Sequence, residues 1–276
     1  MKKTNKILKS VLAACLALSC YSAQAQDSVK VGKIITNTRM LGVGYADVLD
    51  TYITPQKYTG TDFRYISHTV RRAPGSNWSC QLVHEGQFTY THNRANNADD
   101  MGGAYRFSYG MHRHYTFFDN SLEVKVGGEA ALRAGFLYNT RGGNNPAQAQ
   151  LGIDLAPSVA AAYTLYTNKG YPFTFRYEFS VPLVGVMFSP NYGQSYYEIF
   201  SEGDYDHNVV PTTIFSAPSF RHMLTLDFNL LKTTFRVGYL GDYRGAEVND
   251  LKYHGYSSMF VIGFVKKFQI TKFLNL

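Results

Sequence analysis

Apolar and polar residues alternate along several long stretches of this chain. In the stretch 173–181 every odd position is apolar, whereas the even positions are small or polar and include Arg176 and Glu178. Successive side chains of a β-strand point to opposite faces, so this segment is predicted to be a strand with an aromatic face and a charged face. The same period of two recurs in residues 105–114, 122–138, 151–165, 224–230 and 235–243.

The length of these stretches separates two fold classes that suit an aromatic, glycine-rich chain. The longer of these alternations continue for about 10–17 residues. Strands of soluble β-sandwiches have roughly 5–6 residues, whereas a tilted strand that crosses a membrane needs about 9–11. The sequence therefore predicts an all-β, antiparallel, up-and-down transmembrane barrel with its aromatic face toward lipid and its charged face toward the lumen. Closure would also remove the exposed sheet edges.

The connections predict an even number of strands. Short links at 118–120, 168–170 and 231–232 alternate with longer polar links at 93–100, 139–148, 189–194 and 245–250, as expected for turns on one side of a membrane barrel and loops on the other. Twelve strands are expected, at residues 39–52, 60–71, 78–93, 101–117, 121–138, 150–166, 171–188, 194–202, 208–217, 219–231, 233–244 and 252–268. If residues 193–215 form one external loop, the count is ten.

The N-terminal residues resemble a secretory signal peptide. A basic start is followed by a short apolar run and by the small-residue site Ala23-Gln24-Ala25, which predicts cleavage after Ala25 and export through Sec. The alternative is a lipoprotein signal ending at Cys15. The predicted organisation is a signal peptide (1–25), a short periplasmic segment (26–38) and an outer-membrane barrel (39–276). No later segment has the 18 or more consecutive apolar residues of a helical span.

Removal of this leader changes the charge of the protein. Four lysines and no acid leave with it, so 23 basic residues face 20 acidic ones and the formal charge falls from +7 to +3. No basic cluster remains, which argues against a nucleic-acid partner. Cys80 is then the last cysteine, so no intrachain disulfide is expected. The expected partners are outer-membrane lipid, lipopolysaccharide and the barrel-assembly machinery of a Gram-negative cell, while the oligomeric state stays open.

Charged residues of both signs fall on the predicted lumen face. Charges on adjacent strands can pair laterally, and a barrel of intermediate size is either a narrow, porin-like pore or a plugged one. Three functions follow: a narrow passive channel for small solutes, a non-enzymatic structural or surface-binding barrel, and a lipid-acting hydrolase. No cofactor is expected. The predicted lumen-lining residues are Arg106, Glu123, Lys125, Glu129, Arg133, Arg176, Glu178, Arg221, Asp227, Arg236, Asp242 and Arg244.

No catalytic residue can be assigned from local motifs. None of the eight histidines begins the His-x-Ser pattern of an outer-membrane phospholipase, and the nearest stretch, from His114, has a threonine in the serine position. A triad assembled from distant strands stays open. His112 and His114 could hold a metal from one strand, but a polar lumen network is the favoured interpretation. Residues 202–206 place acids at alternate positions, Glu202, Asp204 and Asp206, as at the start of a calcium loop. The glycine and the distant glutamate of such a loop are missing, which favours an acidic turn.

Two segments carry a resemblance to a known family. DTYITPQKYTG (50–60) and SPNYGQSYYEIF (189–200) resemble recurring segments of an uncharacterised Bacteroidota outer-membrane β-barrel family, a domain of unknown function. The resemblance covers essentially the whole mature chain and implies a barrel, but it implies no activity.

Overall fold

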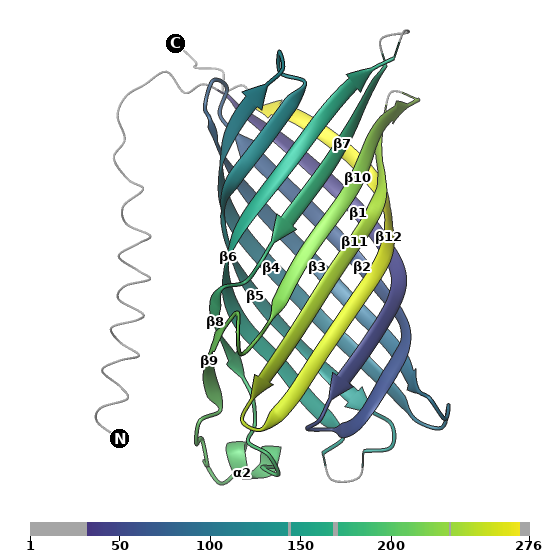
Figure 1. Ribbon diagram of the computed structural model, residues 1–276, viewed down its shortest axis with the longest axis vertical. Coiled ribbons are helices and arrows are strands. Elements are labelled where there is room, and N and C mark those ends of the chain that lie inside the picture. Colours follow the sequence, from purple (N-terminus) through teal and green to yellow (C-terminus); the bar gives the residue numbers. More distant parts are fainter. Residues whose placement is uncertain (1–31, 143–144, 168–170, 232, 271–276) are drawn as a thin grey trace, which may run out of the picture. The chain divides into compact units, whose positions relative to one another are not determined.

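The long alternating stretches form strands in the computed structural model (Figure 1), which describes residues 32–142, 145–167, 171–231 and 233–270. The predicted signal peptide lies outside these residues, as does the predicted link 168–170. The strands are β1 (Lys33–Asp50), β2 (Thr54–Arg72), β3 (Trp78–Asn93), β4 (Asp99–Phe117), β5 (Leu122–Asn139), β6 (Ala147–Tyr166), β7 (Pro172–Ser180), β8 (Val184–Phe188), β9 (Val209–Thr213), β10 (Ser219–Leu230), β11 (Thr233–Val248) and β12 (Leu251–Ile270).

Ten of the strands form a closed antiparallel ring in the order β1-β2-β3-β4-β5-β6-β7-β10-β11-β12, and β12 pairs back onto β1. The predicted all-β antiparallel barrel is thereby confirmed. The ring has the ten strands of the alternative count, and β8 and β9 are two additional short strands. Because β12 pairs with β1, the ring has no terminal strand, and the backbone hydrogen-bonding groups are satisfied within the chain wherever neighbouring strands pair.

The region 171–217 differs most from the prediction. The expected strand 171–188 is interrupted at 181–183, so that β6 pairs with β7 along one part of its length and with β8 along another. The expected strand 194–202 is wrong, because these residues contain the helix α2 (Tyr196–Phe200). Ser195 and Glu198 form a capping box at its start, in which each side chain bonds the backbone N–H of the other residue. The expected strand 208–217 is reduced to β9.

The start of β1 and the end of β11 also differ from the predicted strand boundaries. β1 begins at Lys33, so residues 33–38 of the segment expected to precede the barrel belong to a strand. β11 continues to Val248, and the longer link expected at 245–250 is a two-residue turn of Asn249 and Asp250. Both turn residues have positive φ, 52° and 59°, as a tight turn that matches the twist of a hairpin requires.

The connections define two ends of the barrel. Helix α2 and the β1–β2, β3–β4, β5–β6 and β11–β12 connections lie at one end, called here the α2 end, at the bottom of Figure 1. The β2–β3, β4–β5 and β10–β11 turns lie at the other, called here the turn end. The β4–β5 turn has three consecutive residues of positive φ, Phe118, Asp119 and Asn120.

The two faces of the wall differ as the alternation predicts, with one addition. Phe175 and Tyr177 are 47% and 44% exposed on the outside, with many other large apolar side chains. Inside, however, the lumen also holds an apolar cluster of Met40, Ile66, Val83, Met223, Leu240, Met259 and Val261. The core of this protein is therefore partly inside the ring. None of the helices in the described ranges has the length and apolarity to span a bilayer.

Candidate functional site

The middle of the lumen is crossed by a network of charged side chains. Arg64, whose side chain is 1% exposed, contacts Asp62 at 3.0 Å, Glu85 at 2.8 Å and Asp242 at 2.5 Å. Arg221 contacts the same Glu85 at 2.5 Å and Asp242 at 3.4 Å. These five residues, called here the central network, join β2 and β3 to β10 and β11. Buried charges are costly unless they are paired, and every charge of this network has at least one counter-charge within 4.0 Å.

The apolar cluster fills the lumen on the turn-end side of the central network. On β2, Ile66 follows Arg64 toward the turn end, and on β11 Leu240 lies on the same side of Asp242. Met40, Leu240 and Val261 are at most 1% exposed. Beside this plug, a cavity lined by His68, Gln81 and Arg106 among others has a volume of only about 50 Å³. The plug therefore separates the two ends of the lumen.

All twelve predicted lumen residues lie on the inner face of the wall, and none is exposed. Three groups of them form ion pairs: Arg106 with Glu129 at 3.0 Å, Asp227 with Arg176 and Arg236 at 2.9 and 2.6 Å, and Asp242 with Arg221 and Arg244 at 3.4 and 3.5 Å. Glu123 pairs with Arg72, and Glu178 lies 4.0 Å from His68. Sequence analysis missed Asp62, Arg64 and Glu85, although Asp62 and Arg64 alternate with the outward Phe63 and Tyr65.

A chamber lies between the central network and the α2 end. It consists of two cavities of about 30 and 110 Å³ that share Arg133, Gln150, Arg244 and Tyr253 in their walls. The larger cavity also has an apolar side, lined by Met187, Phe188, Ala246, Val248 and Leu251. We call this space the outer chamber. It presents arginine and amide groups to one part of its volume and hydrocarbon to another, and the carboxyl groups of Asp50 and Asp154 also line the larger cavity.

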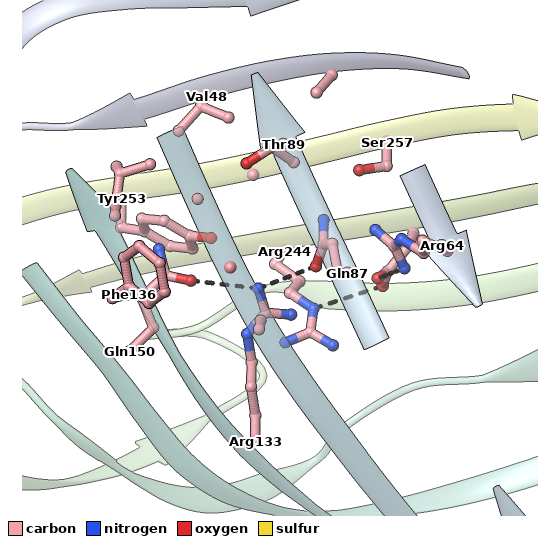
Figure 2. A pocket seen from close by; sticks show the side chains of 17 residues that line it. Val48, Arg64, Gln87, Thr89, Arg133, Phe136, Gln150, Arg244, Tyr253 and Ser257 are labelled. Atoms are coloured by element: carbon pink, nitrogen blue, oxygen red, sulfur yellow. Dashed lines mark hydrogen bonds and ion pairs between the residues drawn. The ribbon is translucent and has the colours of Figure 1, made fainter. Parts of the chain in front are cut away.

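Arg133 differs from the other arginines of the lumen. Its Nη2 donates to the Oε1 atoms of Gln87 and Gln150, both at 3.2 Å, and Figure 2 shows its guanidinium between these two amides. Among the described residues no carboxylate lies within 4.0 Å of it, while the other inward arginines each pair with one, namely Arg64, Arg72, Arg106, Arg176, Arg221, Arg236 and Arg244. Asp154 lines the same chamber beyond ion-pair distance. Arg133 thus keeps its capacity to bind an anion.

Residues 189–208, called here the cap segment, fold over the α2 end. Tyr52 donates its hydroxyl to the carbonyl of Gln194 at 2.9 Å, and Tyr196 donates to Gln148 at 2.8 Å. Ile199 of α2 is fully buried. Burial raises the pKa of Tyr196 to about 12, so this phenol stays protonated and keeps its hydrogen bond at neutral pH. The cap segment is held to the barrel by specific contacts.

The wall beside the outer chamber is interrupted. Two paired positions flank the interruption, Arg221 with Ser180 and Thr213 with Val184. Between them the segment that joins β9 to β10 spans eight residue steps, whereas the segment that joins β7 to β8 spans four. The extra residues form a turn in which Ala217 N–H bonds the carbonyl of Thr213. As a result β9 pairs with β8 alone, and no sheet pairing joins it to β11 in the described part of the chain. Figure 1 shows β8 and β9 diverging from β10 and β11.

The weak metal candidates are dispersed. His112 and His114 face the lumen, where His112 contacts Ser158 and His114 contacts Ser79 and Glu123. Glu202, Asp204 and Asp206 are exposed on the cap segment. Within residues 32–270, as far as they are described, no three His, Cys, Asp or Glu side chains come together as a metal site.

The closed ring and the lipid-type exterior define the chain as an outer-membrane-type β-barrel. The chain belongs to the family described as "Protein of unknown function (DUF3316)", which matches residues 10–274. The family of unknown function expected from the sequence is thereby confirmed, while its bacterial phylum stays a prediction. No curated protein matches the sequence.

Several solved barrels resemble the fold at very low identity. The outer membrane protease OmpT from Escherichia coli is 6% identical, with 90% of this chain and 100% of that chain covered and a TM-score of 0.43. The transport unit of the autotransporter AIDA-I from Escherichia coli is 8% identical, with 92% and 97% covered and a TM-score of 0.38. The COG4313 outer membrane channel from Pseudomonas putida F1 is 7% identical, with 90% and 100% covered and a TM-score of 0.35.

Proposed function

We propose that this protein is an outer-membrane barrel that binds a small anionic, partly apolar molecule in its outer chamber and does not conduct ions along its axis. The chain would be cleaved after Ala25, inserted by the barrel-assembly machinery, and surrounded by lipid and lipopolysaccharide. The exposed outer side chains support this location, since Leu41 and Phe136 are 64% and 53% exposed on the wall. Such apolar area is stable against lipid and costly in water.

The observation that carries the binding proposal is the placement of Arg133. A guanidinium is always charged and presents donors in a planar fork that fits a carboxylate or phosphate. The two glutamine oxygens that contact Arg133 are neutral, and they meet only part of its hydrogen-bonding capacity. In an interior of low dielectric constant, an anion that accepts from Arg133 gains more than it would in water.

The rest of the chamber lining indicates which other chemical group the ligand contains. Opposite the arginine side, Met187, Phe188, Val248 and Leu251 offer an apolar surface. A ligand with a carboxylate at one end and a short hydrocarbon or aromatic group at the other would satisfy both sides. The chamber volume limits such a ligand to a few carbon atoms beyond its charged group.

The narrow channel predicted from the charge pattern has less support. An ion moving along the axis would have to pass Arg64, which is held by three carboxylates, and then the apolar cluster. Leaving one member of a buried ion pair unpaired costs about 3–5 kcal/mol. The structural or surface-binding alternative fits this filled lumen better, and the outer chamber gives it a ligand.

Binding of hexanoate to the purified barrel in nanodiscs, measured by calorimetry, tests the proposal. Hexanoate should bind at least about tenfold more tightly than 1-hexanol, which is about 1.4 kcal/mol. Arg133→Gln keeps an amide beside both glutamines and should remove this preference. Arg113→Gln is the matched control, because Arg113 lies outside on the ring of Tyr115.

Equal affinity for hexanoate and 1-hexanol, or equal loss in both variants, would refute the proposal. Planar-bilayer recordings of the same preparation provide the second part of the test. A steady single-channel conductance in the wild-type protein would restore the narrow channel in its place.

A further inference from the structure

We propose a second chemical site at the turn end, where Ser79, His114 and Glu123 form a nucleophile, a base and an orienting acid for the hydrolysis of small polar esters. This site is separate from the outer chamber, which lies on the other side of the plug, and it does not depend on the proposed binding function. The three residues come from three adjacent strands. Ser79 is the second residue of β3, His114 lies near the end of β4, and Glu123 is the second residue of β5.

The three side chains form one hydrogen-bonded line. The Nε2 atom of His114 is 2.6 Å from the Oγ of Ser79, and its Nδ1 is 2.8 Å from Oε1 of Glu123. A backbone hydrogen bond of 2.8 Å from the N–H of His114 to the carbonyl of Asn77 holds the strands in this alignment. These separations are those required between a nucleophile and its base, and between the base and the group that orients it.

The position of the imidazole hydrogen follows from these distances. An ionised carboxylate only accepts hydrogen bonds, so the Nδ1 atom that contacts Glu123 must carry a hydrogen. In the neutral ring Nε2 is then an acceptor, and the hydroxyl of Ser79 must donate to it. Arg72 Nη1 pairs with Glu123 at 3.0 Å. It also lies 3.2 Å from Nδ1, which could accept from Arg72 only in the other tautomer; the shorter contact of Nδ1 with the carboxylate of Glu123 favours a hydrogen on Nδ1. The serine proton is therefore directed toward the base.

A second serine–histidine pair in the same lumen lacks the third member. His112 Nε2 lies 2.5 Å from the Oγ of Ser158. Its Nδ1 atom is buried and has no hydrogen-bond partner within the described residues. No acid fixes the tautomer of this ring, so nothing directs the proton of Ser158 toward Nε2. The two pairs sit in one protein and differ in the orienting acid, which makes Ser158 a matched control for Ser79.

A vestibule at the turn end borders the site at Glu123, while Ser79 and His114 are buried behind its wall. It has a volume of about 450 Å³ and is lined by Glu123 together with polar side chains that include Thr36, Thr116 and Lys267. Ser79 itself is only 4% exposed, so the acyl group that reaches it must be small. The polar lining favours short, hydrophilic esters over lipid chains.

The reaction is an acyl transfer in two balanced steps. Ser79 Oγ forms a bond to the carbonyl carbon while its proton passes to His114 Nε2, and the ester C–O bond breaks as Nε2 returns the proton to the leaving alcohol. Water then attacks the acyl-serine, with His114 again taking and returning the proton, and releases the acid. Glu123 is a positioning residue in this scheme, because it acts through His114.

A small fluorophosphonate, which phosphonylates activated serines, tests the site in the full mature barrel in detergent. Mass spectrometry should find the label on Ser79 and not on Ser158. Ser79→Ala should abolish labelling, and Ser158→Ala should leave it unchanged. Glu123→Gln should lower the maximal labelling rate at least about 100-fold, because His114 then loses the tautomer and orientation that let it act as the base, with less than about a twofold change in half-saturating probe concentration.

Heat-modifiable gel mobility should confirm that each variant is a folded barrel, so that loss of label cannot reflect unfolding. Absence of label on Ser79 in the folded wild-type protein would overturn the proposal. So would equal labelling of Ser79 and Ser158, or an unchanged rate in Glu123→Gln, since either result would mean that the three residues are a structural network only.

Discussion

Replacement of Arg64 gives the most direct measure of how much the central network stabilises the barrel. The change Arg64→Met keeps an unbranched side chain and removes the guanidinium from between three carboxylates. Arg221 still contacts Glu85 and Asp242, but in the described chain Asp62 has no other ion-pair partner. Its remaining contacts are neutral hydrogen bonds from Gln87 at 2.9 Å and Ser257 at 2.5 Å. The variant therefore leaves one buried carboxylate without a counter-charge.

An uncompensated charge of this kind costs about 3–5 kcal/mol of unfolding free energy. The second change, Asp62→Asn, removes the stranded charge and keeps an oxygen that accepts from Gln87 and Ser257. The double variant should therefore recover at least about half of the stability lost in Arg64→Met. Asp62→Asn alone should cost less, about 1.5–3 kcal/mol, because it loses a charge-assisted hydrogen bond but leaves Arg64 paired with two other acids.

Urea unfolding in lipid vesicles is the assay, and Trp78, the single tryptophan of the chain, reports the transition by its fluorescence. The four proteins form a double-mutant cycle, and a favourable coupling energy of at least 1 kcal/mol is expected between residues that share one network. If Arg64→Met loses less than about 1 kcal/mol, or if the two losses simply add, the central network is not the stabilising element inferred here.

Two further predictions concern the wall and the cap segment. A Cβ atom on Gly127 would clash with the carbonyl oxygen of Met111, whereas one on Gly86 would meet nothing within 4 Å. Gly127→Ala should therefore lose about 1–3 kcal/mol in the urea assay, and Gly86→Ala less than about 0.5 kcal/mol. Similar losses in the two variants would contradict this packing. The hydrogen bonds that Glu198 accepts from Ser195 lower the pKa of its carboxyl group. Because this folded-state pKa lies below the unfolded value of about 4.3, the stabilisation is complete above that value and is lost as the pH falls through the lowered pKa. Hydrogen exchange in the cap segment, corrected for intrinsic rates, should accelerate in acid, and Glu198→Gln should remove this dependence on pH.

The alternation of side chains predicted much of the fold, and its failures have identifiable causes. It separates two faces on β4 and β5, where the exposed positions are mostly aromatic or aliphatic and the less exposed ones carry Arg106, Glu129 and Arg133. It gave no warning of the apolar cluster. Where Met40 and Leu240 point inward their neighbours Leu41 and Tyr239 are also apolar, so the period of two disappears.

The contacts within the site could not be predicted from the sequence, for a different reason. Alternation assigns Arg64 to the lumen, but its pairing with Asp242 joins residues 178 positions apart in the chain, and it depends on how the ring closes. The helix α2, in contrast, had a local signal. Ser195 and Glu198 have the spacing of a capping box, which a search for strand periodicity passes over.

The unpaired edge of β9 has a consequence for how deeply this protein can sit in its membrane. Backbone N–H and C=O groups that lack partners are not tolerated in the hydrocarbon interior of a bilayer, where no water can satisfy them. For a barrel inserted in a bilayer, we therefore expect the boundary between acyl chains and headgroups to fall on the turn-end side of Thr213, with β9 and the cap segment among the headgroups or above them. The interrupted strand pairing at β9 thus indicates the depth at which the barrel is inserted in the bilayer.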